Sequence, residues 1–279
     1  MITQLTTSPA VAIAQRRAGY AAAGVYSGRA RTLIERSWRA LRTTNALVFF
    51  SGFVEPVFYL LAFGFGVGSL VAGGSLGADS RAYAQYIAPA LLATSAMNGA
   101  ISDATWNIFF KMHFDRIYTA MLATSLGPLD VALGEIGWAL LRGGSYAAGF
   151  MVVAAAFHLV TTWWALLAIP AAVVVAFAFA AAGMAATSYM ESLQQVQWLN
   201  FWLLPMFLFS GTFYPLSVYP EWLARIMQSL PLWHAIELVR GCMQAQFTWS
   251  LAGHLLYFAA FIAVGLYFTT RRLTHLFLR

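Results

Sequence analysis

Residues 163–189 read WWALLAIPAAVVVAFAFAAAGMAATSY, and none of them carries a charge. A membrane-spanning helix needs roughly 20 consecutive apolar residues, so this stretch is long enough to cross a bilayer. A helix that is apolar on every side has no polar face to turn toward water. The stretch therefore predicts a membrane-spanning helix, and it decides the class of the whole chain.

The overall composition points to the same class. Of the 279 residues, 61% are hydrophobic and 9% are charged, and the mean hydropathy is +0.70. Soluble domains carry about 25% charged residues, so an ordinary cytosolic enzyme is excluded. The length accommodates about six or seven spans with their loops, which leaves no room for a separate catalytic domain. Cys242 is the only cysteine, which excludes an internal disulfide and a cysteine-rich metal site.

Five other apolar stretches bring the predicted number of spans to six. They cover about residues 46–71, 83–102, 131–156, 198–213 and 251–270. The longest polar stretch inside the chain, residues 103–135, follows the second span. The predicted fold class is an all-α membrane protein whose six transmembrane helices occupy residues 44–270.

Two segments precede the first span. Residues 1–26 are rich in Ala and Thr and lack a firm periodicity, which predicts a flexible tail. In residues 27–43, Leu33, Ile34 and Trp38 recur at helical spacing with arginines between them. This pattern predicts a basic amphipathic helix that lies along the membrane interface. A solvated helix packed on another domain is the alternative.

The stretch before the last span differs from the rest. Pro215, Pro220 and Pro231 divide residues 214–247 into two pieces, and both pieces mix apolar with charged side chains. Neither piece is long or apolar enough to span a bilayer. We expect two short re-entrant or interfacial helices on one side of the membrane.

The distribution of Lys and Arg predicts the orientation. With six spans, both termini lie on one side, and that side carries twelve basic residues. The other side carries three, namely Arg81, Arg225 and Arg240. Because basic residues accumulate on the cytoplasmic side, both termini, including the tail at 271–279, are expected in the cytoplasm. The predicted location is a bacterial plasma membrane, crossed several times.

This plan resembles the permease subunit of ABC-2 type exporters, the type V exporter fold. Within that family the chain is similar to the permeases that export nodulation factors, which are lipo-chitooligosaccharides, and polysaccharides. The resemblance covers about residues 30–270. The stretches that carry it are AMLAT at 120–124, GPLD at 127–130, LGE at 133–135, LLATSAM at 91–97 and LPMFLFSGTFYP at 204–215.

The resemblance implies a transport subunit and not an enzyme. Such a permease pairs with a second copy of itself and binds two copies of a cytosolic ABC ATPase, and nucleotide binding drives alternating access. The sequence contains no GxxxxGK[ST] phosphate loop, so ATP and Mg would be bound by the partner subunit and no cofactor by this chain. Membrane lipids are expected partners, and nucleic acid is not.

Four residues are the candidates for coupling to the ATPase. In this family the loop between spans two and three forms the coupling helix, which maps to about residues 111–126. The segment is too apolar for an exposed loop without a partner. The coupling candidates are Asp115, Arg116, Tyr118 and, near the cytoplasmic end of span three, Glu135. A plain solvated loop and an anchoring role for Glu135 are the alternatives.

Glu55 is the one ionisable residue that the sequence places deep in a span. A buried carboxylate is costly in a bilayer, so Glu55 should face protein or an aqueous cavity. A proton relay or a structural contact are both open. Arg142 lies seven residues after Glu135, too far along a helix to pair with it, and it is expected to reach the headgroups instead.

A substrate path is expected between the two copies of spans one, two and five, with core packing as the alternative. Its candidate residues are Glu55, Thr94, Asn98, Trp202, Phe209 and Phe213. The predicted cargo is an amphipathic molecule such as a lipid-linked saccharide or glycolipid.

Three other functions remain open. A drug or antibiotic efflux permease would have the same fold. A stand-alone secondary transporter would need more acidic residues at membrane depth and an inverted repeat. A membrane-embedded enzyme would need a polar catalytic cluster, whereas the five histidines do not cluster in the sequence.

Overall fold

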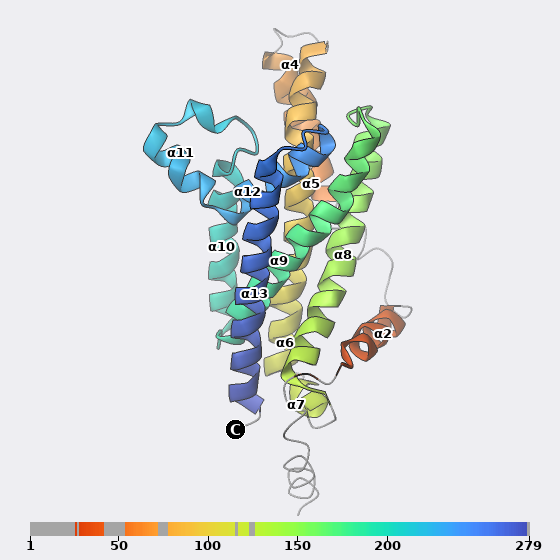
Figure 1. Ribbon diagram of the computed structural model, residues 1–279, viewed down its shortest axis with the longest axis vertical. Helices are drawn as coiled ribbons and strands as arrows, with labels where there is room; N and C mark the ends of the chain where they lie inside the picture. The colour runs from red at the N-terminus through yellow and green to blue at the C-terminus, as the bar shows by residue number, and fades with distance from the viewer. Residues whose placement is uncertain are drawn as a thin grey trace, which may run out of the picture.

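The computed structural model describes residues 26, 28–41, 54–71, 78–114, 117–122 and 126–277. Every regular element within these ranges is a helix, and the long helices stand side by side in one upright bundle (Figure 1). The predicted tail at 1–26 lies almost entirely outside the described residues. The all-α fold class is confirmed.

The helices follow one another in this order. They are α2 (Ala30–Leu41), η2 (Leu60–Val67) with the helical residues 54–59 before it, α4 (Gly68–Val71), α5 (Ala78–Ser102), η3 (Asp103–Asn107), α6 (Ile108–His113), α7 (Ile117–Leu122), α8 (Pro128–Ala156), η4 (Trp163–Leu167), α9 (Ala168–Ser188), α10 (Leu193–Phe209), η5 (Leu216–Val218), α11 (Glu221–Gln228), α12 (Pro231–Met243) and α13 (Trp249–Phe277).

Three of the described helices are long and apolar enough to cross a membrane: Pro128–Ala156, Trp163–Ser188 and Trp249–Leu276. Val54–Val67 is apolar but shorter. Helix α5 has the length but carries several polar residues, and α10 has only 17 residues. The number of six spans therefore stays a prediction.

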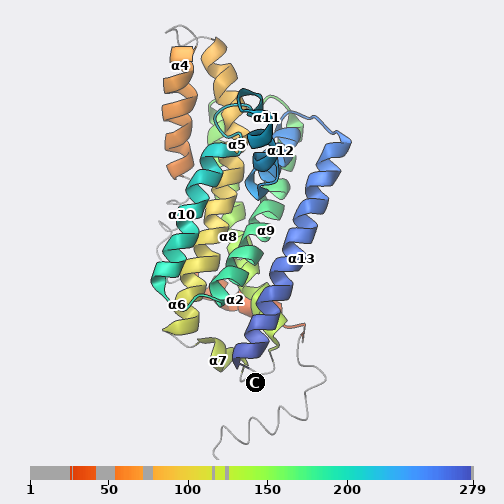
Figure 2. The same cartoon turned by 90° about the vertical axis from the view of Figure 1, so that its left-hand side faces the viewer.

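Helix α9 is central to the bundle, where it packs against α5, α8, α12 and α13 (Figure 2). Small residues allow these close approaches, as is usual for helices packed in membranes. A Cβ atom at Gly265 of α13 would lie 2.8 Å from the carbonyl carbon of Ala181, and one at Gly183 would lie 3.1 Å from the Cβ of Ala104. Helix α13 therefore approaches the backbone of α9 at Gly265, whereas Gly183 of α9 approaches the Cβ of Ala104.

The second long helix extends further than the sequence predicts. We expected it to end near Ser102, but α5, η3 and α6 continue one another without a break to His113. Asp103, assigned above to the polar loop, is buried within the bundle. The helix can continue because the charged residues on this segment find partners on α8, described below.

Helix α2 forms where the amphipathic pattern predicts it, and it lies beside the lower part of α8 (Figure 1). Its Leu33 is buried against Gly134, and Ile34 lies over Gly137. The carboxylate of Asp130 accepts hydrogen bonds from the backbone N–H of Arg29 at 2.8 Å and of Gly127 at 3.0 Å. One side chain therefore caps α8 and holds the start of α2.

The two short helices expected before the last span are α11 and α12, and Pro231 opens α12 as a first-turn proline can. They lie near the end of the bundle opposite α7 and the C-terminus (Figure 2). Whether they enter the membrane stays a prediction.

A partly buried arginine, Arg240, anchors the turn that leads into these helices. Gly211 has a φ of 78°, a conformation that favours glycine. Its carbonyl oxygen accepts hydrogen bonds from Arg240 and from the Tyr86 hydroxyl, both at 3.3 Å. The Arg240 guanidinium also lies 4.5 Å from the centre of the Tyr86 ring and pairs with Glu237. The turn is thereby tied to α5 and α12.

The expectation that the histidines do not cluster is wrong for one pair. His234 of α12 and His254 of α13 are in contact, with 2.7 Å between their Nδ1 atoms. They are 20 residues apart in the sequence and meet because α12 packs against α13. Burial and the neighbouring His254 lower the pKa of His234 below its ordinary value, which favours the neutral imidazole.

Candidate functional site

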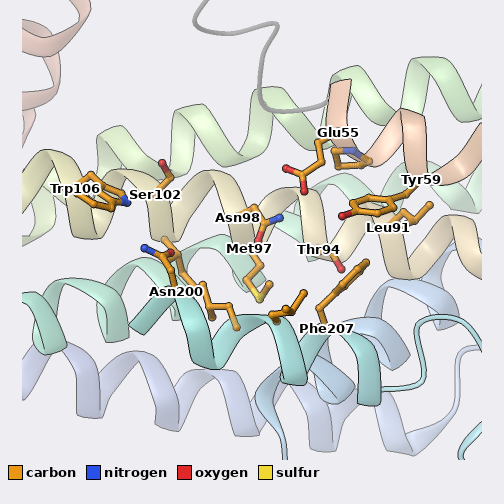
Figure 3. A pocket seen from close by; sticks show the side chains of 14 residues that line it. Glu55, Tyr59, Leu91, Thr94, Met97, Asn98, Ser102, Trp106, Asn200 and Phe207 are labelled. Atoms are coloured by element: carbon orange, nitrogen blue, oxygen red, sulfur yellow. The ribbon is translucent and has the colours of Figure 1, made fainter. Parts of the chain in front are cut away.

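A cavity of about 300 Å³ lies between the helix that contains Glu55, helix α5 and helix α10 (Figure 3). Helix α5 contributes a polar row, Thr94, Asn98 and Ser102, whose members are four residues apart and therefore share one face. Helix α10 contributes Asn200 from the opposite side. The cavity thus has hydrogen-bonding groups on two of its walls.

Two of these polar groups already have partners in their own helices. The Thr94 hydroxyl donates to the carbonyl of Ala90 at 2.8 Å, and the Asn200 amide donates to the carbonyl of Val196 at 3.2 Å. Their oxygens remain able to accept hydrogen bonds. The half-buried Asn98 side chain and the Glu55 carboxylate turn toward the same space (Figure 3).

Aromatic rings form the apolar part of the wall. Tyr59 lies one helical turn after Glu55 and interacts with its carboxylate. The Tyr59 ring packs on Phe207, with 5.6 Å between ring centres, and Trp106 lines the far end of the cavity. Glu55 itself is exposed, whereas Pro56 beside it is buried. The cavity can hold a molecule that has both a polar and an apolar part.

The structure brings three of the six predicted path residues together. Glu55, Thr94 and Asn98 all line the cavity. Trp202 and Phe209 do not line it, and their side chains are 68% and 41% exposed. Phe213 is buried, with its ring centre 4.7 Å from that of Phe63 and 5.3 Å from that of Phe207.

The residues of α10 that do line the cavity were missed. They are Asn200, Leu203, Leu204 and Phe207, which recur at intervals of three or four and so share a helix face. The aromatic residues of this helix cover more than one face, and the predicted Trp202 and Phe209 do not share the face that lines the cavity. Asn200 follows the glutamines at 194, 195 and 197 and lies closest to the apolar part of the helix, and this was the available signal.

Two ion pairs, each formed by a buried acid and a partly buried base, join the continuous helix α5–α6 to α8. The Lys111 Nζ lies 2.6 Å from the Glu135 Oε2, and an Arg142 Nη lies 2.6 Å from the Asp103 Oδ1. Each helix contributes one acid and one base: α5–α6 has its base in the first pair and its acid in the second, and α8 has the reverse. The pairs are separated by seven residues on α8, roughly 10 Å. We call these four residues the charge ladder.

The charge ladder corrects one expectation. Arg142 does not extend toward headgroups, because it pairs with Asp103 and donates a further hydrogen bond to the Tyr146 hydroxyl at 2.8 Å. Pairing with Glu135 was excluded by distance, and Glu135 indeed has another partner. The sequence offered no signal for these pairs, since their members are 24 and 39 residues apart.

The predicted coupling segment is partly described. Asp115 and Arg116 lie outside the described residues. Tyr118 is fully buried, and burial followed by the charge of Glu135 raises the pKa of its phenol well above its ordinary value. Tyr118 therefore packs beneath α7 and is not part of its exposed surface. Phe114 of this segment is 62% exposed, and Phe110 just before it is 42% exposed.

Within the described ranges, no group of three or more His, Cys, Asp or Glu side chains could hold a metal ion. The arrangement offers a mixed polar and aromatic cavity and a charged connection between two helices. The cavity can bind a small molecule reversibly, and the ion pairs link α5–α6 mechanically to α8.

Comparison with known proteins identifies similar chains. The profile of the family described as "ABC-2 type transporter" matches residues 29–244. Nodulation protein J of Rhizobium leguminosarum bv. trifolii is 32% identical over 227 residues, which is 81% of this chain and 85% of that protein. The proteins of the same name from R. leguminosarum bv. viciae and Sinorhizobium fredii are 31% and 30% identical, over 76% and 75% of this chain and 80% and 78% of their own lengths.

Proposed function

Since the chain belongs to the ABC-2 type transporter family, in the branch of the nodulation J proteins, we propose that it is the permease subunit of an exporter. Its proposed cargo is an amphipathic lipid-linked saccharide or glycolipid, which it moves out across the plasma membrane. The membership itself makes the chain a transmembrane component of an ABC exporter. It is a transport subunit and not a catalytic enzyme. The cavity beside Glu55 carries the proposal, because its amide and hydroxyl groups suit a saccharide and its aromatic wall suits a ring or an acyl chain.

A second copy of the chain completes the path in this proposal. The described residues that line the cavity come from the first span, α5, η3 and α10 of one chain. Phe58, Leu61 and Leu204 on these elements are exposed large apolar residues. A partner copy placed against this side would cover them and close the cavity into a passage along the dimer axis.

The energy comes from a separate ABC ATPase, bound at the end of the bundle that carries α6 and α7. Phe110 and Phe114 supply the exposed apolar contact there. The Lys111–Glu135 ion pair joins α6 to α8, so a displacement of α6 would be passed to α8 and inward to Arg142. Both ATP and Mg belong to the partner.

This proposal is tested by disrupting the contact with the ATPase. We expect the double variant Phe110→Asp, Phe114→Asp to lose co-purification with the partner ATPase and ATP-driven transport in proteoliposomes, because two charges would replace the apolar contact. Ile226→Asp, at an exposed apolar position on α11, is the matched control and should retain both. Normal transport by the double variant would refute the placement of the ATPase.

The orientation is tested by labelling single cysteines in intact cells. After Cys242→Ser, which removes the buried native thiol, Ser217→Cys should react with an impermeant maleimide added outside. His275→Cys, which is also exposed, should react only after the cells are opened. The expectation follows from the excess of basic residues on the side of the termini. Outside labelling at position 275 would reverse the topology.

The drug-efflux alternative shares the family and the fold, and it differs only in the cargo. The same proteoliposomes distinguish the two, because a saccharide exporter should accumulate a glycolipid and leave a hydrophobic dye behind.

A further inference from the structure

The cavity carries one formal charge. Among the described residues that line it, Glu55 is the only acid, and no Lys, Arg or His lines it. The other polar groups, including Thr94, Asn98, Ser102 and Asn200, are neutral. Among the described lining residues, a ligand therefore meets a carboxylate and neutral hydrogen-bonding groups but no basic side chain.

Lys111 of α6 and Arg142 of α8 are committed to other partners. Lys111 and Arg142 are paired with Glu135 and Asp103 between α5–α6 and α8, whereas the cavity lies where α5 faces the first span and α10. To reach the cavity, either base would have to leave a buried acid without its partner, which is costly. These bases are not available to a ligand.

The consequences for an anionic ligand are unfavourable. Phosphate, pyrophosphate and sulfate groups are recognised in proteins by Arg, Lys or clustered N–H donors. Here such a group would lie near the exposed Glu55 carboxylate, and like charges repel each other. An amine or an N–H or O–H donor would instead gain a charge-assisted hydrogen bond to Glu55. The rings of Tyr59 and Phe207 also suit a cation or the flat face of a sugar.

We infer that the cavity selects neutral or cationic amphiphiles and rejects anionic ones, with Glu55 as the residue that sets this preference. The ligand class is a glycolipid or amino sugar bearing a lipid chain, or a lipophilic amine, and not a saccharide linked to its lipid through phosphate. The inference rests on the proposed function only for the statement that the bound molecule is cargo. Selection by charge is a property of binding and can be measured without ATP.

The test uses three probes that share a pyranose ring and a dodecyl chain and differ in charge. They are the dodecyl glycosides of glucosamine, N-acetylglucosamine and glucuronic acid, which are cationic, neutral and anionic. Equilibrium binding of each radiolabelled probe is measured with the full-length protein in nanodiscs of zwitterionic lipid, after subtraction of empty nanodiscs. The wild type should bind the amine most tightly, the N-acetyl probe next and the glucuronide weakest.

Glu55→Gln should weaken binding of the amine by roughly tenfold to a hundredfold, the effect of losing a charged hydrogen bond. The same variant should change the affinity for the N-acetyl probe by no more than about twofold, since glutamine still accepts a hydrogen bond. Glu55→Asp should retain the order of the three probes. Glu221→Gln, at an exposed carboxylate of α11, is the matched control and should change nothing.

Two results would overturn the inference: a wild type that binds the glucuronide as well as the amine, or a Glu55→Gln variant with an unchanged order. Retained binding of the N-acetyl probe shows that a variant is folded. Failure of the proposed function has a different signature, because charge-selective binding would persist while ATP-driven transport is absent.

Discussion

Replacing Arg142 with methionine should reduce the free energy of unfolding by about 3–5 kcal/mol, the usual cost of breaking a buried ion pair. The methionine fills much of the space of the arginine stem but leaves Asp103, which is buried, without its charge partner. The measurement is unfolding of the purified protein by SDS in mixed micelles, followed by tryptophan fluorescence. We also expect a lower yield from the membrane.

Two comparisons make this result specific. The double variant Arg142→Met, Asp103→Asn removes both charges and should recover most of the lost stability, because no unpaired charge remains. Arg225→Met breaks the Arg225–Glu221 pair, which is exposed, and should have little effect. Equal losses in Arg142→Met and Arg225→Met would mean that the charge ladder does not stabilise the bundle.

Gly265→Ala should be the most damaging of the small substitutions in α13. The added methyl group would lie 2.8 to 3.0 Å from the backbone and Cβ atoms of Ala181, and backbone atoms cannot move aside cheaply. Overpacking of this kind costs about 1–3 kcal/mol, which exceeds the gain of up to about 1 kcal/mol in helix propensity. The helices α9 and α13 should separate slightly, which SDS unfolding and cross-linking between them would detect.

Gly253→Ala in the same helix is the matched control. A Cβ atom there would have nothing within 4 Å, so only the propensity gain remains. This variant should be as stable as the wild type or more stable. If both substitutions had the same effect, close packing at Gly265 would not be what joins α13 to α9.

The sequence predicted those parts of the fold that depend on chain length and local pattern. The uncharged run at 163–189 became η4 and α9, which end at Ser188. Proline at position 231 marked the start of α12, since it fits the first turn of a helix and interrupts a later one. In these cases the residues that decide the structure are close together in the chain.

The parts that could not be predicted depend on the rotation of one helix against another. Asp103 looked like the start of a loop because a lone aspartate is costly in a bilayer, and only its contact with Arg142 makes it acceptable there. In α10, Phe207 and Phe209 point in directions about 200° apart around the helix axis. Which of them faces the cavity depends on how α10 is rotated about its axis, and no local sequence pattern predicts that rotation. Thr94 and Asn98 line the same cavity because α5 carries one polar face, and their role in a substrate path stays a prediction.

The Asp130 cap has a consequence for the time course of biosynthesis. The hydrogen bond from the Arg29 backbone to Asp130 joins residues 101 positions apart. A ribosome adds about 5–20 residues per second, so α2 is complete roughly 5–20 seconds before its docking site on α8 is made. During that interval its apolar side has no protein to cover it, and the bilayer surface is the nearest place that can. We therefore expect newly synthesised α2 to bind the bilayer surface first and to pack against α8 once α8 has been synthesised.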